Sequence, residues 1–329
     1  MGIPLGRPRG RYDLAMILCV TLNPCLDKTL TVPAWGPGDS IRGLAVREMV
    51  GGKGNNVARA LTRLGRTARP VTFLGGPVGA HCEALLRGDD GLDPLVTPTE
   101  APTRIILTAR TGETSDQTAF FDPDPAVSAS EAAALYNRVE GALTEGGITA
   151  VSLSGSSPSD ATHGLYAELI SLARARGVPV LIDSYGAALD AIWGFWPDVI
   201  QLNRREAAAH LRRPQAEDSD VFDLLARWAR HGVECGVVTD GPRPVLSLDR
   251  GRYYRVVPPP VEPVNPIGSG DCFLAGLIDA RLSSLDPELA LRHALACAVA
   301  NALVWDAGGI DPGRVRELEE AVEVECLPR

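Results

Sequence analysis

Residues 268–278 read G-S-G-D-C-F-L-A-G-L-I, a short glycine-rich segment that leads directly into an apolar run. Phe273 and Leu277 lie four residues apart in that run, which predicts a helix that begins near Asp271. The first backbone N–H groups of a helix have no partner within it, and glycine lets an anion approach them closely. The segment therefore predicts a pocket for a transferring phosphate, with Asp271 placed to accept a proton from an attacking hydroxyl. A simple turn before a helix is the alternative.

A second glycine cluster stands at residues 51–56, G-G-K-G-N-N, and precedes the run V-A-R-A-L-T-R-L-G. Val57, Leu61 and Leu64 form an i, i+4, i+7 stripe, so this loop is also expected to open a helix. It is not a Walker A loop, because the spacer of four residues and the Lys-Ser/Thr pair are absent. It does not match the G-x-G-x-x-G dinucleotide pattern either.

Apolar strands alternate with helical patterns along the chain, which predicts a doubly wound α/β sandwich of three layers with a mostly parallel central sheet. Segments 28–50 and 102–121 break this rhythm, and we expect them to form a small β-sheet lid. Residues 16–329 are expected to form a single domain after a disordered tail over residues 1–15. Strands are expected over 16–22, 71–74, 149–153, 178–182, 198–202 and 234–239, and helices over 55–64, 161–176, 220–231, 271–282, 287–306 and 312–324.

The composition disfavours several classes of protein. A net charge of −9 argues against nucleic acid or an anionic membrane as the main partner. No apolar run reaches the length of a membrane span, and residues 1–15 lack the apolar core of a secretory signal. The seven cysteines are odd in number and scattered, so neither a disulfide framework nor a zinc site is expected, and the cytoplasm is the expected location.

Six short motifs follow one another along the chain: N-P-x-L-D ending at Asp27, G-G-K-G-x-N-V-A-R-A-L from residue 51, Thr103-Arg104, Ser154-Gly155-Ser156, Asn203-x-x-Glu206 and G-S-G-D from residue 268. In this order they resemble the ribokinase-like, PfkB-type carbohydrate kinases. Within that family the chain is most similar to the branch that holds 1-phosphofructokinase and tagatose-6-phosphate kinase. The resemblance covers roughly residues 16–310 and implies phosphoryl transfer from ATP with Mg²⁺.

The resemblance also implies roles for single residues. Asp271 would be the general base, and the N–H groups of Gly268, Ser269 and Gly270 would stabilise the charge that develops on the phosphoryl group. The substrate-binding residues would be Asp27, Gly52, Lys53, Asn56, Arg104 and Ser156. Among these, Lys53 and Arg104 would meet the phosphate that the sugar already carries, since Arg suits bidentate phosphate recognition and Lys adds a point charge. Turn capping or ordinary surface solvation is the alternative for these side chains.

On the nucleotide side the resemblance implies Asn203, Thr239, Gly241 and Asn301 as binding residues. Glu206 would arrange Mg²⁺ through water, because this ion dehydrates reluctantly and suits a single carboxylate.

Three positions depart from the family's pattern. Gln201 stands where a lysine is often found, which removes a positive charge from the nucleotide phosphates. Pro242 stands where a further glycine is usual, and proline has no N–H to donate; Arg243 is a candidate replacement for that contact. Asp124 also replaces a usual glycine, in the segment F-D-P-D-P.

We therefore expect an ATP-dependent kinase that phosphorylates a primary hydroxyl of a ketohexose phosphate. Fructose 1-phosphate is the first candidate, followed by tagatose 6-phosphate and fructose 6-phosphate. A kinase of the same fold for an unphosphorylated sugar or a nucleoside is the alternative, which Lys53 and Arg104 disfavour. A degenerate kinase that binds sugar phosphate as a sensor is the alternative from another class, which Gln201 suggests and Asp271 opposes. A homodimer through the β-lid is also expected.

Overall fold

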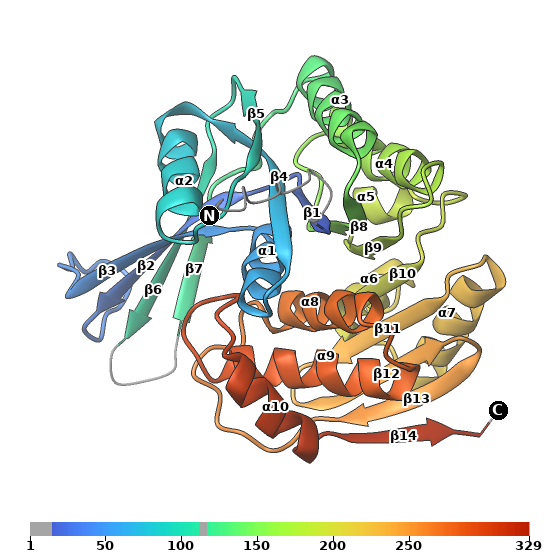
Figure 1. The fold of residues 1–329 in the computed structure, drawn as a ribbon. Helices are drawn as coiled ribbons and strands as arrows, with labels where there is room; N and C mark the ends of the chain where they lie inside the picture. The colour runs from blue at the N-terminus through green and yellow to red at the C-terminus, as the bar shows by residue number, and fades with distance from the viewer. Residues whose placement is uncertain (1–14, 112–116, 329) are drawn as a thin grey trace, which may run out of the picture.

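A computed structural model of the chain describes residues 15–111 and 117–328. Its largest element is a ten-stranded sheet that crosses the whole molecule (Figure 1). In order across the sheet, the strands are β14 (Glu323–Leu327), β13 (Arg252–Val257), β12 (Arg243–Asp249), β11 (Cys235–Asp240), β10 (Val199–Asn203), β9 (Val180–Asp183), β8 (Ile148–Ser154), β1 (Met16–Thr21), β4 (Thr67–Gly75) and β5 (Leu95–Thr99). Neighbours from β11 to β5 pair in parallel, whereas β12, β13 and β14 add an antiparallel edge.

Helices cover both faces of this sheet, because the central strands are apolar on both sides. In β1, Ile17 and Cys19 belong to one hydrophobic core, and Leu18 and Val20 belong to the other. The first core is completed by α1 (Lys53–Arg63), α2 (Gly76–Gly88), α8 (Ser269–Leu282), α9 (Pro287–Ala302) and α10 (Pro312–Ala321). The second is completed by α3 (Ala129–Glu145), α4 (Leu165–Arg174), α5 (Ala187–Asp190), α6 (Arg204–His210) and α7 (Asp218–Arg230). This is the predicted doubly wound sandwich of three layers.

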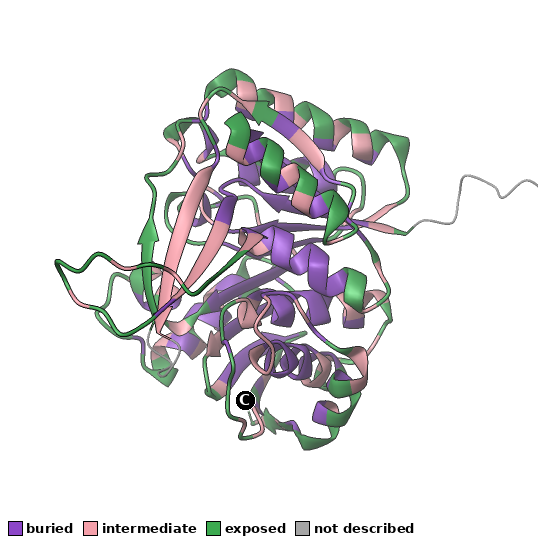
Figure 2. Ribbon diagram, turned by 90° about the vertical axis from the view of Figure 1, so that its left-hand side faces the viewer, coloured by how far each residue is buried: buried purple, intermediate pink, exposed green. Residues whose placement is uncertain are grey.

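A second, four-stranded sheet projects from one side of the molecule and corresponds to the predicted lid (Figure 1). Its order is β3 (Ala45–Gly51), β2 (Cys25–Val32), β6 (Arg104–Thr111) and β7 (Gln117–Phe121). Its strands are mostly exposed or half-buried (Figure 2). Helix α8, by contrast, is mostly buried. Two contacts tie it to the loop after α9: Arg47 pairs with Asp306 at 2.5 Å, and Arg110 stacks 4.3 Å from the ring centre of Trp305.

Strands β5, β12 and β13 and helices α5 and α6 are absent from the sequence expectations, and three other parts of the chain differ from them. Helix α2 was not predicted, because G-G-P at residues 75–77 is typical of a turn, although proline also suits the first turn of a helix. The helix expected over 312–324 ends at Ala321, and β14 follows. Its alternating E-V-E-C-L pattern has the period of a strand, and Glu325 lies opposite Arg255 of β13. The expected helix over 161–176 begins only at Leu165, after a 3₁₀ turn at Asp160–Thr162.

The predicted N-terminal tail lies outside the described residues except for residue 15, and residues 112–116 of the predicted lid also lie outside them. Within the described parts, no helix is long and apolar enough to cross a bilayer.

Candidate active site

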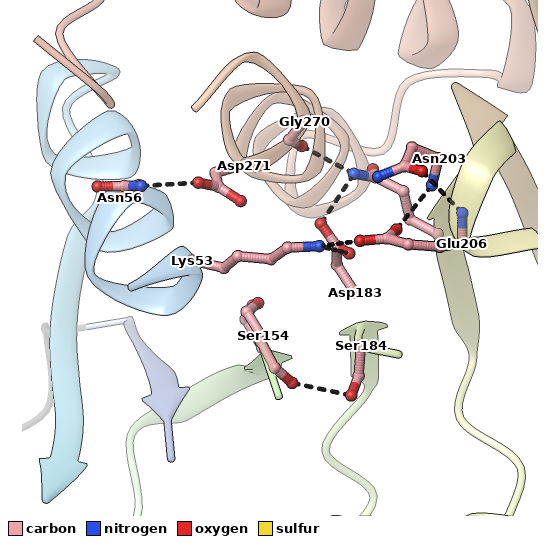
Figure 3. Close-up of polar contacts among 12 residues, drawn as sticks. Lys53, Asn56, Ser154, Asp183, Ser184, Asn203, Glu206, Gly270 and Asp271 are labelled. Atoms are coloured by element: carbon pink, nitrogen blue, oxygen red, sulfur yellow. Dashed lines mark hydrogen bonds and ion pairs between the residues drawn. The ribbon is translucent and has the colours of Figure 1, made fainter. Parts of the chain in front are cut away.

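The glycine segment at residues 268–271 begins α8, as its sequence predicts. Gly268 is the N-cap of the helix and has the left-handed φ of +85°. A Cβ atom there would lie 2.8 Å from the Cβ of Ala307, so a larger residue would strain the backbone and also clash. The N–H of Ser269 donates to the carbonyl of Pro266 at 3.2 Å. The segment is therefore packed closely against the loop after α9, with the start of the helix facing the carboxyl ends of the parallel strands (Figure 3).

Asp271 lies in the first turn of α8 and is only 6% exposed. Burial, together with the charge of Asp183, raises the pKa of Asp271 to about 7, although Lys53 and a hydrogen bond from Asn56 oppose the rise. A carboxyl group with this pKa is half ionised near neutral pH, which suits a general base.

Asn56 of α1 is oriented by Arg59, one helical turn further on. Arg59 donates through Nη1 to Oδ1 of Asn56 at 2.8 Å, and Nδ2 of Asn56 donates to Oδ2 of Asp271 at 2.7 Å. Because a guanidinium group can only donate, the amide oxygen must face Arg59 and the NH₂ group must face Asp271. Arg59 is itself held by Asp90 and by the carbonyls of Val50 and Ala307. The sequence predicted that Asn56 meets the sugar, and in the structure its amide donates to Asp271.

Lys53, the first residue of α1, points into a group of carboxylates at the ends of two central strands (Figure 3). Its Nζ lies 2.7 Å from Oδ1 of Asp183, at the end of β9, and 2.9 Å from Oε1 of Glu206, at the start of α6. Burial alone would lower the pKa of Lys53, but the charges of Asp183 and Glu206 outweigh it and raise the pKa well above its usual value. The sequence predicted Lys53 at the sugar's phosphate, and here its ammonium group is paired with these carboxylates.

Glu206 and Asn203 cap α6 reciprocally. The side chain of Asn203 accepts from the N–H of Glu206 at 2.9 Å, and Oε2 of Glu206 accepts from the N–H of Asn203 at 2.9 Å. Burial and the charge of Asp183 raise the pKa of Glu206, although the charge of Lys53 and the hydrogen bond from the N–H of Asn203 act to lower it.

Gln201 lies beneath the glycine segment and is only 1% exposed. Its Nε2 donates to the carbonyl of Gly270 at 2.8 Å and to Oδ2 of Asp183 at 3.3 Å. The side chain thus links the glycine segment to the carboxylate group from inside the protein. Its Oε1 atom is buried without a hydrogen-bond partner among the described residues.

A cation fits between Asp183 and Glu206, because one ammonium nitrogen already lies within 3 Å of both carboxylates. Within the described parts of the chain, no cluster of three or more His, Cys, Asp or Glu side chains is arranged to hold a metal. Two carboxylates with water and phosphate oxygens are the usual protein contribution to Mg²⁺ bound with a nucleotide. The residues present therefore fit a Mg²⁺–nucleotide complex in which Asp183 and Glu206 would hold the ion.

The remaining nucleotide-side predictions have different surroundings. Asn301 is fully buried, where its amide donates to the carbonyl of Ile267 at 2.9 Å and its Oδ1 accepts from the N–H of Gly308 at 2.8 Å. It also donates to Oγ of Ser269 at 3.3 Å, so it links the glycine segment to the loop after α9. Thr239 lies next to the end of β11, and Gly241 turns the chain with a φ of +57°. Arg243, the suggested replacement donor, is exposed and pairs with Asp240 at 3.0 Å.

Asp27 lies in the lid strand β2, facing the start of the second glycine loop. A Cβ atom at Gly51 would lie 2.0 Å from its Oδ2, so only glycine leaves room for this carboxylate. Burial raises the pKa of Asp27 to about 6, although Cys25, Arg104 and Arg59 act in the opposite direction. Gly52, with a φ of +108°, completes the turn into α1.

Arg104 and Ser156, both predicted to bind substrate, are brought together by Asn23. Nδ2 of Asn23 donates to Oγ of Ser156 at 3.1 Å, and the carbonyl of Asn23 accepts from Nη2 of Arg104 at 3.3 Å. Asp124 completes the group: its Oδ1 accepts from Nδ2 of Asn23 at 2.8 Å and from Nη1 of Arg104 at 2.9 Å.

The sequence did not single out Asp183, Arg59 or Asn23 as site residues. Asp183 carries the same signal as Asp27 and Asn203, namely a polar side chain at the carboxyl end of a buried strand, and an expected strand ending at residue 182 stops just before it. Arg59 is only 5% exposed. Its local sequence, however, is that of an ordinary cation on a helix surface, and no nearby pattern predicts its burial.

Comparison with known proteins agrees with this geometry. The family described as pfkB family carbohydrate kinase matches residues 20–310. The chain belongs to this family. Phosphofructokinase-2 from Escherichia coli, in its tetrameric inhibited form, superimposes with a TM-score of 0.83 at 26% identity, covering 94% of this chain and 99% of that one. The same enzyme in complex with fructose-6-phosphate superimposes with a TM-score of 0.81, again at 26% identity and over 94% and 99% of the two chains.

A possible 1-phosphofructokinase from Thermotoga maritima has the same fold, with a TM-score of 0.82 at 23% identity over 95% of this chain and 100% of that one. The chain is thus a carbohydrate kinase of the PfkB family with a ribokinase-like fold. Membership of a kinase family implies ATP as a substrate and, typically, a divalent metal ion.

Proposed function

We propose that this kinase transfers the γ-phosphoryl group of ATP, as its Mg²⁺ complex, to a primary hydroxyl of a ketohexose phosphate. The observation that carries the phosphotransfer is Asp271, a buried carboxyl group with a pKa raised to about 7 at the start of α8. It stands between the amide of Asn56 and the group formed by Lys53, Asp183 and Glu206 (Figure 3). A base and a cation site next to a helix N-terminus are the parts that phosphoryl transfer to an alcohol needs.

In the proposed reaction, Asp271 accepts the proton of the acceptor hydroxyl as that oxygen forms its bond to the γ-phosphorus. The bond from the γ-phosphorus to the bridging oxygen breaks, and ADP leaves with that oxygen. The N–H groups at the start of α8, with Gly268 giving them close access, face the charge that builds up on the phosphoryl oxygens. Asp183 and Glu206 would hold Mg²⁺, which would supply positive charge to the phosphates. The ammonium group of Lys53 would contact the transferring phosphate, while Thr239, Gly241 and Asn203 would lie on the nucleotide side.

For the acceptor, we propose that Asp27 hydrogen-bonds sugar hydroxyls and that Arg104, with Asn23 and Ser156, binds the phosphate already on the sugar. Nδ2 of Asn23 donates to Oγ of Ser156, and the carbonyl of Asn23 accepts from Nη2 of Arg104. Arg104 and Asn23 also donate to the same oxygen, Oδ1 of Asp124, so a cation and an amide point to one place. Fructose 1-phosphate is the first candidate, with tagatose 6-phosphate and fructose 6-phosphate next. The structurally similar E. coli phosphofructokinase-2 has been crystallised with fructose-6-phosphate, which supports a ketohexose phosphate as the class of acceptor.

An unphosphorylated sugar is the second candidate, and Asp124 favours it. The carboxylate of Asp124 already neutralises Arg104, so the cation expected for the sugar's phosphate is paired in the free enzyme. A non-catalytic sensor fits less well, because the base, the cation site and the glycine segment are all assembled.

A coupled assay of ADP release across a panel of sugars and sugar phosphates tests the proposal. We expect turnover of at least one ketohexose phosphate, with kcat/KM higher than for the matching free sugar. Turnover of free sugars alone would establish the second candidate. Tight binding of a sugar phosphate with no turnover, and no binding of millimolar Mg-ATP by calorimetry, would establish the sensor.

We also propose that the lid forms a homodimer contact. By strand register, Val46 and Phe120 lie on the same face of this sheet, and they are 58% and 52% exposed, which leaves apolar surface there for a partner. Sedimentation of wild type and of Phe120→Glu tests this: the dimer is expected for the wild type and the monomer for the variant.

A further inference from the structure

Asp124 occupies the place in this molecule where an anionic ligand is expected. It lies between β7 and α3, in the segment D-P-D-P, and its side chain is 46% exposed. A single oxygen, Oδ1, accepts from both Nη1 of Arg104 at 2.9 Å and Nδ2 of Asn23 at 2.8 Å. A guanidinium and an amide that converge on one anionic oxygen make the type of contact that binds a phosphate oxygen.

The contact leaves this polar group incompletely satisfied. Nε of Arg104 is buried without a hydrogen-bond partner in the part of the chain that the structure describes. The carboxylate of Asp124 therefore uses only part of the donor capacity of this guanidinium group. A phosphate has more oxygen atoms and a higher charge, so it can compete for the same donors.

We propose that Asp124 is a specificity-determining residue that acts as a built-in anion and competes with the substrate's phosphate for Arg104 and Asn23. This inference rests on the proposed sugar site. An acceptor with a phosphate must displace the carboxylate of Asp124 before it can pair with Arg104, whereas an acceptor with a hydroxyl at that end need not. Pro123 and Pro125 fix φ on either side of Asp124, so the exposed side chain can turn into solvent without moving the loop.

Kinetics of Asp124→Asn test this competition. KM for the ketohexose phosphate should fall at least about tenfold, which corresponds to about 1.4 kcal/mol, because the neutral amide competes less well for Arg104. Both kcat and KM for Mg-ATP should change by less than about twofold, since Asp124 does not touch Asp271 or the carboxylates around Lys53. A residue with only a structural role would not change KM for the sugar phosphate alone.

Asp122→Asn is the matched control. It removes the same charge two residues away, and its amide oxygen can still accept the N–H of Ile105, which Oδ2 of Asp122 accepts at 2.9 Å. An equal fall in KM for both variants would show a general charge effect and would overturn the proposal. An unchanged KM in Asp124→Asn would overturn it as well.

Calorimetry with inorganic phosphate as the probe separates this inference from the proposed function. Asp124→Asn should bind phosphate at least about tenfold more tightly than wild type, and Arg104→Ala should bind it equally weakly with or without the second substitution. If only free sugars are turned over, the ketohexose phosphate proposal fails, and the gain in phosphate affinity still supports the role of Asp124. If phosphate affinity does not respond to Asp124→Asn, the competition does not exist, whatever the acceptor is.

Discussion

The sequence assigned two cations to the same substrate phosphate, and in the structure each is paired with carboxylates. Lys53 pairs with Asp183 and Glu206, and Arg104 pairs with Asp124. The side chains of Asp183 and Glu206 are only 4% and 14% exposed, at the ends of central strands. The side chain of Asp124 is 46% exposed, on a loop beside the lid. The carboxylates that pair with Lys53 are thus part of the packed body of the protein, whereas the carboxylate that pairs with Arg104 lies at its surface.

This difference in burial determines how well each part of the site tolerates substitution. Removing one partner of a buried pair leaves an uncompensated charge, whereas a half-exposed carboxylate that loses its partner is solvated by water. The catalytic half of the site is therefore expected to tolerate little change, and the sugar half is expected to change its specificity at small cost in stability. The following variants test this contrast.

The largest effect is expected for Asp271→Asn. The amide cannot accept a proton, so kcat should fall at least about a hundredfold, within the usual range for general-base catalysis. The dissociation constant of the sugar phosphate should stay nearly the same, because the proposed contacts of its phosphate are with Arg104, Asn23 and Ser156 and not with Asp271. Steady-state kinetics with calorimetry measure both quantities, and a near-normal kcat would exclude Asp271 as the base.

Lys53→Met should lower the free energy of unfolding by about 3 kcal/mol, since two partly or fully buried carboxylates lose their cation. Arg104→Met is the control, with an expected loss of about 1 kcal/mol or less because Asp124 remains in solvent. Urea titrations measure both. Equal losses would contradict the contrast between the two pairs.

The loss of unfolding free energy in Lys53→Met should also depend on pH. Loss of the lysine charge raises the pKa of Glu206 further above its usual value, so the folded state binds a proton more tightly than the unfolded state. A group of this kind makes the folded state more stable as the pH falls through its folded pKa. The difference in unfolding free energy between Lys53→Met and wild type should therefore become smaller as the pH is lowered from 8 towards about 5.

The sequence predicted the layers of this fold because its central strands are apolar on both faces and its helices carry clear i,i+4 patterns. It did not predict α2, which starts with a Gly-Pro pair, or the antiparallel edge strand β14, whose one-sided pattern follows directly on α10. Local patterns at these points favour a turn and a longer helix. Only the neighbouring sheet and core select the observed structure.

For the site, motif order indicated Asp271, Glu206 and Arg104, since each stands in a distinctive local segment. The partners of these residues depend on tertiary contacts between distant segments. Asn56 meets Asp271 from a position 215 residues away, and Lys53 meets Glu206 from a position 153 residues away. The sequence could therefore indicate candidate residues for the chemistry, but not which of them are paired with one another.

Asn56→Ala should shift the pH dependence of activity. The hydrogen bond from Asn56 lowers the pKa of Asp271, so its loss should raise that pKa above the value of about 7. Activity that requires the ionised carboxylate then falls more at pH 6.5 than at pH 8.5, by about tenfold for a shift of one unit. A kcat/KM profile measured over this range gives the apparent pKa. An unchanged midpoint with a uniformly lower rate would indicate that Asn56 acts on the sugar alone.

The smallest effect is expected for Gln201→Lys, which restores the lysine often found in the family. In the structure this position is buried between the carbonyl of Gly270 and Oδ2 of Asp183, so the new ammonium would pair with Asp183 beneath the glycine segment. A positive charge there should attract the nucleotide phosphates at the start of α8. The increase in nucleotide affinity should be small, because the ammonium group is buried between these two acceptors.

We expect KM for Mg-ATP to fall by about two- to fivefold, less than the effect of one exposed charge-assisted hydrogen bond. The same charge should favour the ionised form of Asp271, so the midpoint of the kcat/KM profile should move below about 7. Gln201→Met is the control, because it fills the same space without a charge and should not improve KM. If Gln201→Lys and Gln201→Met behave alike, the residue only packs beneath the segment, and the weaker nucleotide site inferred from its sequence does not exist.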